Sequence, residues 1–382
     1  MEIRRLTEQD YDDFLTFHAQ VYPSHLNVKD RFQFQFLGNP LLQDKTKTEI
    51  FFARDKEKKI IGQYSVNPVE YSFGASTRLG FCGCDLFVDQ QARKYGVGGL
   101  LSMKAINSCK PHFSIGVSTE AKPLLLSLQM KKIGAVYRYI WIRNWSKIPL
   151  LIIQYLRQRK LKSCQLSRRE SQEELTEESS PKQIDPVVFS SLISFNDYSF
   201  SLLSSKQSLT SLDQDYTPSN NKNRDYLTFA RSPAFLQWRF FTKPGYGVYQ
   251  LTKKSSSPGE REDFNRYYFA IRKISWKKLN LLAIVDLQAD FSEQKMVQAM
   301  ITATKRIAKE NKCDGIITLS SYAGLDRALK KKLFVNVGHP FEIYTNVDIL
   351  FSEDQIQRRE AVHITMVDSD LEFPFWPKAG DD

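Results

Sequence analysis

Long hydrophobic runs are missing from this sequence of 382 residues. No segment reaches the roughly 18 consecutive apolar residues that a membrane-spanning helix needs. The N-terminus reads MEIRRLTEQDYDDF and lacks the apolar centre of a secretory signal peptide. These absences argue against the transmembrane and secreted classes, and they predict a cytoplasmic protein.

Cysteine and histidine are scarce, with five of each in the chain. An odd, scattered set of cysteines in a long chain does not suit a disulfide framework. Cys82 and Cys84 stand two residues apart on an expected strand, so both point to one face of it. Because the histidines are dispersed, these thiols lack the further ligands of a metal site. We therefore expect reduced thiols and no metal.

Positive charge exceeds negative charge, since 54 lysines and arginines face 43 acidic residues and give a net charge of +11. Such an excess favours anionic partners, among them nucleotides, phosphates and acidic lipids. The chain shows no zinc-finger spacing, no RNA-binding aromatic motif and no long basic tail. We therefore expect no nucleic-acid partner.

Strand and helix patterns alternate over the first 145 residues. Strands are expected over 2–6, 49–54, 60–71, 78–88, 112–117 and 135–143, and helices over 7–21, 97–108 and 120–132. Gly134 stands where the last helix would be capped. The order contains a strand–helix–strand unit, which predicts a mixed sheet with a parallel central pair. The fold class is therefore α/β, with an α+β type of mixed sheet.

The remainder of the chain divides into two parts. Residues 147–185 join a basic, partly apolar segment to an acidic, Ser-rich linker. Residues 186–382 repeat the element order of residues 78–143. Strands are expected there over 245–252, 266–275, 281–287, 314–319 and 341–349, and helices over 232–242, 292–311 and 322–332. We therefore expect a first domain over 1–146, the linker, and a second domain of the same architecture.

One segment carries most of the chemical information. Directly after the strand over 78–88 and before the helix over 97–108, the chain shows the pattern R-x-x-G-x-G, from Arg93 to Gly98. A helix N-terminus presents unpaired N–H groups and the positive end of its dipole, and glycines let the backbone approach an anion closely. With a lysine beside the arginine, the pattern predicts a cradle for a pyrophosphate.

This segment resembles motif A of the GNAT (Gcn5-related N-acetyltransferase) superfamily, and the opening IRRLTEQDYDDF and the charged hairpin before IIGQYSV look like that family too. The resemblance covers residues 1–145. It implies a GNAT fold that binds acetyl-CoA or another acyl-CoA, with the backbone of Phe87 and Val88 along the pantetheine arm. The implied pyrophosphate site consists of Arg93, Lys94, Tyr95, Gly96, Val97, Gly98 and Gly99. A plain strand-to-helix turn is the alternative, although it does not require two glycines.

Acylation of an amine needs a base for the ammonium group and an acid for the leaving thiolate. In many GNAT enzymes a Tyr four residues before a Gly is the acid, but here Met130 precedes Gly134 and cannot donate a proton. Tyr137 and Tyr139 lie on the next expected strand. Tyr137 is our candidate acid, with a core aromatic as the alternative.

Asp85 is the candidate base. It stands within an apolar strand, three residues before Val88, where the family often carries a carboxylate, and burial would raise its pKa toward that of a base. A solvent-facing aspartate is the alternative. His112, at the start of the neighbouring strand, is the second candidate, with a structural histidine as its alternative.

The expected second domain lacks the cradle. After its strand over 281–287 the chain reads QADFSE, without glycine, and Asp290 and Glu293 would repel a pyrophosphate. We expect this domain to shape the acceptor site or to stabilise the first domain. The stretch from Arg231 to Phe240 resembles an R-x-x-x-x-L-x-W-R-aromatic stretch of bacterial two-domain GNAT proteins, with helix packing as the alternative.

Together these patterns predict an N-acyltransferase, in the first place an N-acetyltransferase, that acts on a small-molecule amine such as an amino sugar or a nucleotide sugar. Two alternatives stay open: a Fem-like aminoacyl or peptidyl transferase, and a non-catalytic CoA-binding scaffold.

The segment over 147–162 joins an apolar run to four cations, Arg157, Arg159, Lys160 and Lys162. This combination is typical of a helix that contacts an acidic membrane surface. A linker helix packed across the two domains is the alternative.

Overall fold

The structure is a computed structural model. It describes residues 1–22, 28–44, 47–74, 76–143, 188–195, 197–203, 226–253, 267–276, 279–349 and 351–368. The predicted linker over 147–185, with its basic segment, lies outside the described residues. Within the described ranges, no helix is long and apolar enough to cross a membrane.

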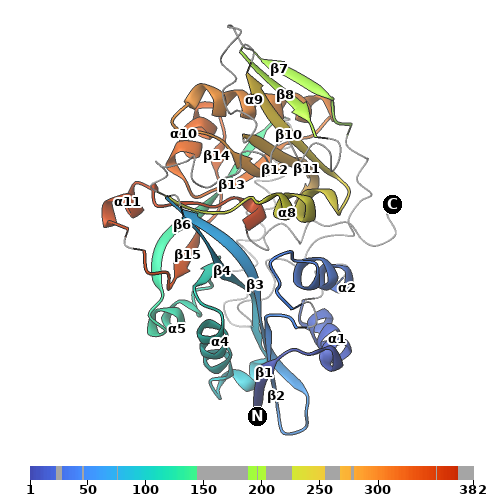
Figure 1. The fold of residues 1–382 in the computed structure, drawn as a ribbon, viewed down its shortest axis with the longest axis vertical. Coiled ribbons are helices and arrows are strands. Elements are labelled where there is room, and N and C mark those ends of the chain that lie inside the picture. The colour runs from blue at the N-terminus through green and yellow to red at the C-terminus, as the bar shows by residue number, and fades with distance from the viewer. Residues whose placement is uncertain are drawn as a thin grey trace, which may run out of the picture.

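The first half of the chain is a strand meander followed by a strand–helix–strand unit (Figure 1). Its elements are β1 (Glu2–Arg5), η1 (Glu8–Asp10), α1 (Tyr11–Val21), α2 (Val28–Arg31), η2 (Phe32–Leu37), β2 (Ile50–Arg54), β3 (Ile60–Phe73), β4 (Ser76–Val88), α3 (Gln90–Arg93), α4 (Val97–Ser108), β5 (His112–Ile115), α5 (Lys122–Ser127) and β6 (Lys131–Ile142). Strands β1 to β4 pair antiparallel in sequence order. β5 pairs parallel to β4, between Phe81–Gly83 and His112–Ser114. The predicted parallel central pair is confirmed.

The second half has a similar order of elements, with some additional short ones. They are β7 (Leu192–Phe195), β8 (Tyr198–Leu202), β9 (Leu227–Phe229), α8 (Pro233–Leu236), η5 (Gln237–Phe241), β10 (Tyr246–Lys253), β11 (Tyr268–Trp276), β12 (Leu279–Gln288), α9 (Gln294–Glu310), β13 (Gly315–Ser320), α10 (Ala323–Lys331), β14 (Val335–Asn336), β15 (Phe341–Thr345), α11 (Glu353–Gln357), β16 (Val362–His363) and η7 (Met366–Asp368). β12 pairs parallel to β13, as β4 does to β5. The pairing of β4 with β3 shifts register next to Ser65, and the pairing of β12 with β11 shifts register next to Ala270. The predicted repeat of element order is therefore seen in the strand pairing.

One predicted boundary is wrong. The helix expected over 120–132 is the shorter α5, and β6 begins earlier than expected, at Lys131. Gln129 follows α5 in a left-handed conformation, with a φ of 60°. Gly134 lies inside β6, where it pairs with Ile343 of β15, and is no helix cap. Strand pairing decides the conformation here, because a ladder partner from the second half stabilises the extended backbone.

The two halves share one sheet because they exchange strands (Figure 1). The strand order through the described residues is β1-β2-β3-β4-β5-β15-β6-β13-β12-β11-β10-β8-β7. β15, from the second half, pairs with β5 and with the start of β6. The end of β6, from the first half, pairs with β13 through residues 137–142. The predicted boundaries therefore divide the chain in sequence, but they do not divide the sheet.

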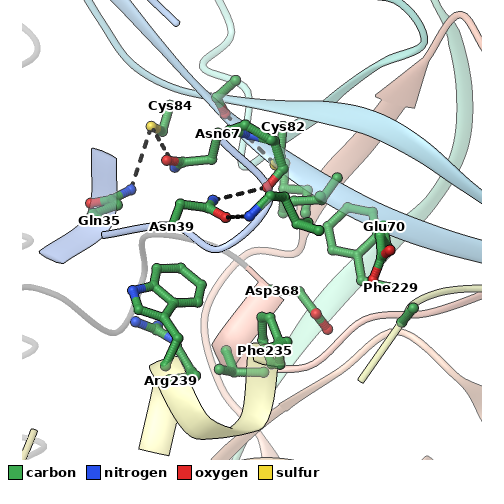
Figure 2. Close-up of a pocket in the computed structure, with 18 residues that line it drawn as sticks. Gln35, Asn39, Asn67, Glu70, Cys82, Cys84, Phe229, Phe235, Arg239 and Asp368 are labelled. Carbon is green, nitrogen blue, oxygen red and sulfur yellow. Dashed lines mark hydrogen bonds between the residues drawn. The ribbon is translucent and has the colours of Figure 1, made fainter. Parts of the chain in front are cut away.

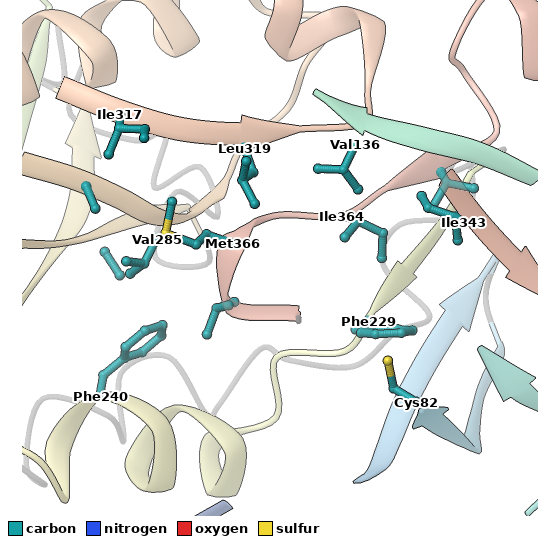
Figure 3. Close-up of a cluster of buried hydrophobic side chains, with 14 of the residues drawn as sticks. Cys82, Val136, Phe229, Phe240, Val285, Ile317, Leu319, Ile343, Ile364 and Met366 are labelled. Atoms are coloured by element: carbon teal, nitrogen blue, oxygen red, sulfur yellow. The ribbon is translucent and has the colours of Figure 1, made fainter. Parts of the chain in front are cut away.

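An extensive apolar cluster lies across the junction of the halves (Figure 3). It joins Cys82 and Val136 of the first half to Phe229, Leu319 and Ile343 of the second. Two further clusters lie beneath helices, one under α4 in the first half and one under α9 and α10 in the second. Because burial of apolar surface drives folding, the shared cluster makes each half depend on the other.

Ile343 tests this dependence. Its side chain is 1% exposed, and it pairs with both β5 and β6. We expect Ile343→Ala to lower the free energy of unfolding by about 2–5 kcal/mol, because it leaves a cavity in the shared cluster. Hydrogen exchange should accelerate in β5 and in β6 together.

The control is Val335→Ala, at an exposed position of β14, which should change the free energy of unfolding by less than about 0.5 kcal/mol. Faster exchange confined to the second half would contradict the dependence of the first half on β15.

Candidate functional site

The predicted loop connects β4 to α4. β4 ends at Val88, and Asp89 then caps the short helix α3 by accepting a hydrogen bond from the N–H of Gln91 at 3.0 Å. Gly96 follows with a φ of 70°, a left-handed conformation that costs an L side chain about 1–2 kcal/mol and glycine nothing. α4 begins at Val97. The predicted arrangement of strand, glycine loop and helix is confirmed.

The N–H groups of this loop fall into two sets. Those of Arg93, Tyr95 and Gly96 donate to carbonyl oxygens inside the loop, at 3.1 Å each. These three N–H groups therefore already have partners, and their contact with a pyrophosphate stays a prediction. The N–H groups of residues 97–99 belong to the first turn of α4, where no helical carbonyl precedes them. They are the donors that can receive an anion, and the dipole of the 12-residue helix favours one there.

The side chains of the loop add positive charge at its surface. Nε of Arg93 donates to the carbonyl oxygen of Val88 at 3.0 Å. Lys94 and Tyr95 are exposed, and Nζ of Lys94 lies 5.0 Å from the centroid of the Tyr95 ring. The arginine therefore fixes the loop to the end of β4, while the lysine is available at the loop surface.

β4 and β5 separate beyond the middle of β4. Their pairing ends at Gly83 and Ser114, while β4 continues to Val88. Among the described strands, none pairs with this edge of β4 over its last residues, and β3 occupies the other edge. An extended ligand fits along such a free edge, as an added strand would. The role of Phe87 and Val88 along a pantetheine arm stays a prediction, and their position is compatible with it.

Asp85 lies at the bulge of β4, with a φ of 51°. Its carboxylate is 2.7 Å from Nη2 of Arg31, and the two side chains are 3% and 4% exposed. The backbone carbonyl of Asp85 accepts a hydrogen bond from Nε2 of Gln63 at 3.3 Å. The solvent-facing alternative is therefore wrong. The guanidinium stabilises the charged carboxylate and fixes α2 against β4, so Asp85 has a structural contact, and its role as a base stays a prediction.

His112 lies in the interior. Its side chain is 0% exposed, and Nε2 is 2.9 Å from the hydroxyl of Tyr64. Burial lowers the pKa of His112 to about 4, so the ring is neutral at neutral pH. Gly83 lies directly against this pair, because a Cβ at that position would come 2.8 Å from Nε2 of His112. This position fits the structural alternative, and the role of His112 as a second candidate base stays a prediction.

Tyr137 faces the second half of the chain. It pairs with Ser320 of β13, and the guanidinium carbon of Arg359 lies 3.8 Å from the centroid of its ring. β15 separates β6 from β5 in the sheet, so Tyr137 is remote from the place where β4 and β5 part. This position argues against the predicted role of Tyr137 as the acid. Tyr139 is buried in the core, and Met130 is buried under α4.

A pocket of about 650 Å³, part of it open to solvent, lies between the halves (Figure 2). Cys82 and Cys84 both line this pocket, in agreement with the prediction that their side chains lie on one face of β4. Gly83 stands between them, and a side chain there would point the other way, toward Tyr64 and the cluster under α4. β4 therefore has α4 behind one face and this pocket in front of the other.

A polar network joins the pocket to the bulge of β4. Sγ of Cys84 accepts hydrogen bonds from Nε2 of Gln35 at 3.7 Å and from Nδ2 of Asn67 at 3.4 Å. Oε1 of Gln35 accepts one from Nε of Arg31 at 2.8 Å, and Arg31 binds Asp85. Oδ1 of Asn67 is buried and has no hydrogen-bond partner among the described residues. The pocket wall therefore carries an unused hydrogen-bond acceptor.

On the side of the second half, a buried ionic cluster reaches the pocket. Arg231 binds Asp286 at 2.7 and 3.2 Å, and its Nη2 lies 2.7 Å from Oδ1 of Asp368, which lines the pocket. Burial raises the pKa of Asp286, but Arg231 and the hydroxyls of Tyr268 and Thr365 outweigh it and hold this pKa below its usual value. Burial and the charge of Asp286 raise the pKa of Asp368 to about 6, against the opposing effect of Arg231.

Among the described residues of the second half, the ends of β12 and β13 show no opening like that between β4 and β5. The chain segment after α11 fills the place at the ends of β12 and β13. Nε2 of His363 lies 3.1 Å from the carbonyl oxygen of Leu287, and Oγ of Ser321 donates to the carbonyl oxygen of Val362 at 2.8 Å. At the start of α9, the hydroxyl of Tyr198 donates to Glu293. The expectation that this half lacks a pyrophosphate site stays a prediction.

The sequence patterns did not point to the acidic residues of the pocket, Glu70 and Asp368, which come from β3 and η7. The pattern noted in the stretch from Arg231 to Phe240 pointed to part of the pocket. Arg231 belongs to the ionic cluster, and Trp238 lines the pocket. Phe240 packs in the core, which agrees with helix packing, the alternative for this stretch.

No protein-family model and no curated protein matches the chain. Solved structures match it in fold. A GCN5-related N-acetyltransferase from Anabaena variabilis has a TM-score of 0.53 at 10% identity, over 90% of this chain and 72% of that one. One from Kribbella flavida has a TM-score of 0.52 at 10% identity, over 90% and 71%. N-myristoyltransferase of Saccharomyces cerevisiae with bound myristoyl-CoA has a TM-score of 0.51 at 11% identity, over 90% and 82%. The chain therefore has the GNAT fold that its sequence predicts.

The buried imidazole of His112 makes the stability depend on pH. The unfolded residue binds a proton near pH 6.5, whereas the folded residue does so only near pH 4, so the unfolded state binds more protons between these values. The stabilising contribution of neutral His112 is therefore lost as pH falls through this range. Relative to wild type, His112→Gln should gain up to about 3 kcal/mol in free energy of unfolding between pH 7 and pH 4.

Denaturant unfolding of both proteins at several pH values measures this difference. Taking the difference removes the contributions of other groups that titrate in both proteins, Asp368 among them. Parallel pH curves for the two proteins would show that His112 is not buried in its neutral form.

Asp85→Asn tests the contact with Arg31. Removing one partner of a buried ion pair costs about 3–5 kcal/mol, since a charge remains in the interior. The double variant Arg31→Met, Asp85→Asn removes both charges and should recover most of the loss, because asparagine tolerates the left-handed backbone of residue 85. Unchanged stability of the single variant, measured by denaturant unfolding, would contradict the structural role. Turnover by the double variant would exclude Asp85 as the base.

Proposed function

We propose that the protein is an acyl-CoA-dependent N-acyltransferase whose first half binds the acyl-CoA and whose pocket between the halves receives an amine. One observation carries the proposal: β4 runs between the proposed acyl-CoA site and the pocket. Its end leads into the glycine loop and α4, and its residues Cys82, Gly83 and Cys84 line the pocket.

The donors proposed for the pyrophosphate are the N–H groups of residues 97–99, with Arg93 and Lys94 beside them. The left-handed backbone accounts for Gly96, but the fold itself does not require Gly98 and Gly99. A Cβ at Gly98 would lie 3.5 Å from Val88 and a Cβ at Gly99 would lie 3.6 Å from Leu124, which are ordinary contacts. A ligand that approaches the backbone closely accounts for both glycines.

The free edge of β4 is the proposed path of the pantetheine arm, from the loop toward Gly83. In the transfer, the deprotonated amine attacks the thioester carbonyl, the carbon–nitrogen bond forms, and the carbon–sulfur bond breaks with a proton going to the thiolate. Asp85 and His112 do not line the pocket, whereas Glu70 and Asp368 do. The two pocket carboxylates therefore take precedence as the groups nearest to an incoming amine.

Acetyl-CoA is the proposed donor in the first place. The yeast structure that shares this fold contains myristoyl-CoA, and the pocket walls include Phe229, Phe235 and Trp238, which suit a longer acyl chain as well. Turnover with an acyl-CoA series from acetyl to myristoyl, against a panel of amines, separates these donors. Binding of CoA without turnover of any amine would favour a non-catalytic CoA-binding protein.

Gly98→Val tests the proposed pyrophosphate site. The branched side chain would occupy space in front of the first turn of α4, and we expect it to weaken acetyl-CoA binding by about tenfold or more, as loss of hydrogen bonds to a charged group does. Isothermal titration calorimetry measures the affinity, and thermal unfolding without ligand checks the fold.

The matched control is Leu100→Val, at a half-exposed position of the same helix, which should leave the affinity within about twofold because it changes no first-turn N–H group. Equal affinity for acetyl-CoA in folded Gly98→Val and in wild type would refute the proposed site.

A further inference from the structure

We infer that the pocket between the halves recognises a protonated primary amine on an apolar or aromatic body, and that Asp368 binds the ammonium group. The inference rests on the proposed function and deepens it, because it names the acceptor class of that site. It follows from the charges, the hydrogen-bond acceptors and the apolar walls of the pocket.

The charge around the pocket is negative, although the net charge of the protein is +11. The charged groups that line the pocket, with the ion pairs directly behind them, are Glu70, Asp85, Asp286 and Asp368 against Arg31, Arg231 and Arg239. The carboxylates outnumber the guanidiniums among the described residues. A cation is therefore the ligand that balances the pocket.

The negative charge of Asp368 is only partly balanced by Arg231. Arg231 binds Asp286 through Nε and Nη2, and Asp368 meets only the Nη2 atom that Asp286 already uses. Thr365 donates to the other oxygen of Asp368 through its N–H at 2.8 Å, and its hydroxyl lies between the two carboxylates, 2.9 Å from Asp286 and 3.1 Å from Asp368. The side chain of Asp368 is 1% exposed, and a buried carboxylate with a shared cation is costly to keep ionised. A second cation in the pocket relieves this cost.

The groups that face this carboxylate come from several elements. Arg231 follows β9, Asp286 lies on β12 and Tyr268 on β11, and the hydroxyl of Tyr268 binds Asp286 at 2.5 Å. Across the pocket, Glu70 of β3 and Arg239 of η5 complete the charged surroundings (Figure 2). Arg239 packs against the rings of Phe34 and Trp238, at 5.7 and 5.9 Å from their centroids.

The pocket offers the acceptors that an ammonium group needs. A primary ammonium group has three N–H donors and no acceptor. Asp368, Glu70 and Asn67 all line the pocket, and Oδ1 of Asn67 has no hydrogen-bond partner among the described residues. An alcohol of the same shape would leave most of these acceptors unused and would not balance the charge.

The rest of the pocket suits an apolar body. Phe229, Phe235 and Trp238 line it from the second half and Val69 from the first. Flat rings pack well against such walls. A nucleotide sugar, which the sequence analysis proposed as one acceptor, would bring phosphates into a pocket with excess negative charge, so we expect it to be excluded.

The test uses the full chain, with 2-phenylethylamine as the probe and 2-phenylethanol as its neutral counterpart. Binding is measured by saturation-transfer NMR and calorimetry at pH 7.5, and acetyl-CoA affinity is measured in parallel. We expect the amine to bind at least about tenfold more tightly than the alcohol, as a charge-assisted hydrogen bond does. Asp368→Asn should remove this preference and leave acetyl-CoA affinity within about twofold, because it leaves the glycine loop intact.

The pH profile supplies an independent readout. The amine stays protonated below about pH 10, while Asp368 becomes charged as pH rises through about 6. Affinity of wild type for the amine should therefore rise between pH 5 and pH 7.5, and the Asp368→Asn variant should show no such rise. Asp12→Asn, at an exposed position of α1, is the control and should behave like wild type.

The outcomes separate the two proposals. Acetyl-CoA binding with equal affinity for amine and alcohol would overturn the inference and leave the proposed function standing. Absence of acetyl-CoA binding would overturn the proposed function. Amine preference in wild type that persists in folded Asp368→Asn would show that another group binds the ammonium, and it would overturn the assignment of Asp368.

Discussion

β6 and β15 each complete the sheet of the half from which they do not come, and the ladders between them hold the halves together. Separation of the halves would break these ladders and expose the apolar cluster that spans the junction. Both costs are large, because unpaired buried backbone groups and exposed apolar surface are each unfavourable. The pocket between the halves therefore has walls whose relative positions are set by the sheet itself.

β4 brings the parts of the site together within this frame. Its pairing with β5 stops at Gly83, and the bulge at Asp85 changes the course of the strand just beyond that point. Arg31 holds the bulge from the side of α2. At Gly83 the strand has no side chain, so the Tyr64–His112 pair lies directly behind the backbone that lines the pocket. One strand thus leads from the glycine loop at the start of α4 to a pocket on the opposite face.

The two halves share an architecture but differ where their parallel strands part. Where β4 and β5 part, the edge of β4 has no described strand beside it, and a glycine loop follows. Where β12 and β13 part, the segment with His363 and Ser321 as its contacts closes the space. This segment continues to Asp368, so the same stretch of chain that fills the second half supplies a charged group to the pocket.

The local features of this protein follow from its sequence. The alternation of apolar residues predicted most strands and helices, and the glycines before Val97 predicted the loop, because conformational preference and helix-end chemistry depend on neighbouring residues. The tertiary structure decided which residues meet. Gly134 reads as a helix cap, but a strand from the second half makes it part of β6. The sequence suggests three catalytic candidates, Asp85, His112 and Tyr137, but each contacts a residue that lies far away in the sequence. Asp368 is held at the pocket by its contact with Arg231. Pairing across the exchanged strands is a long-range effect, and no local pattern contains it.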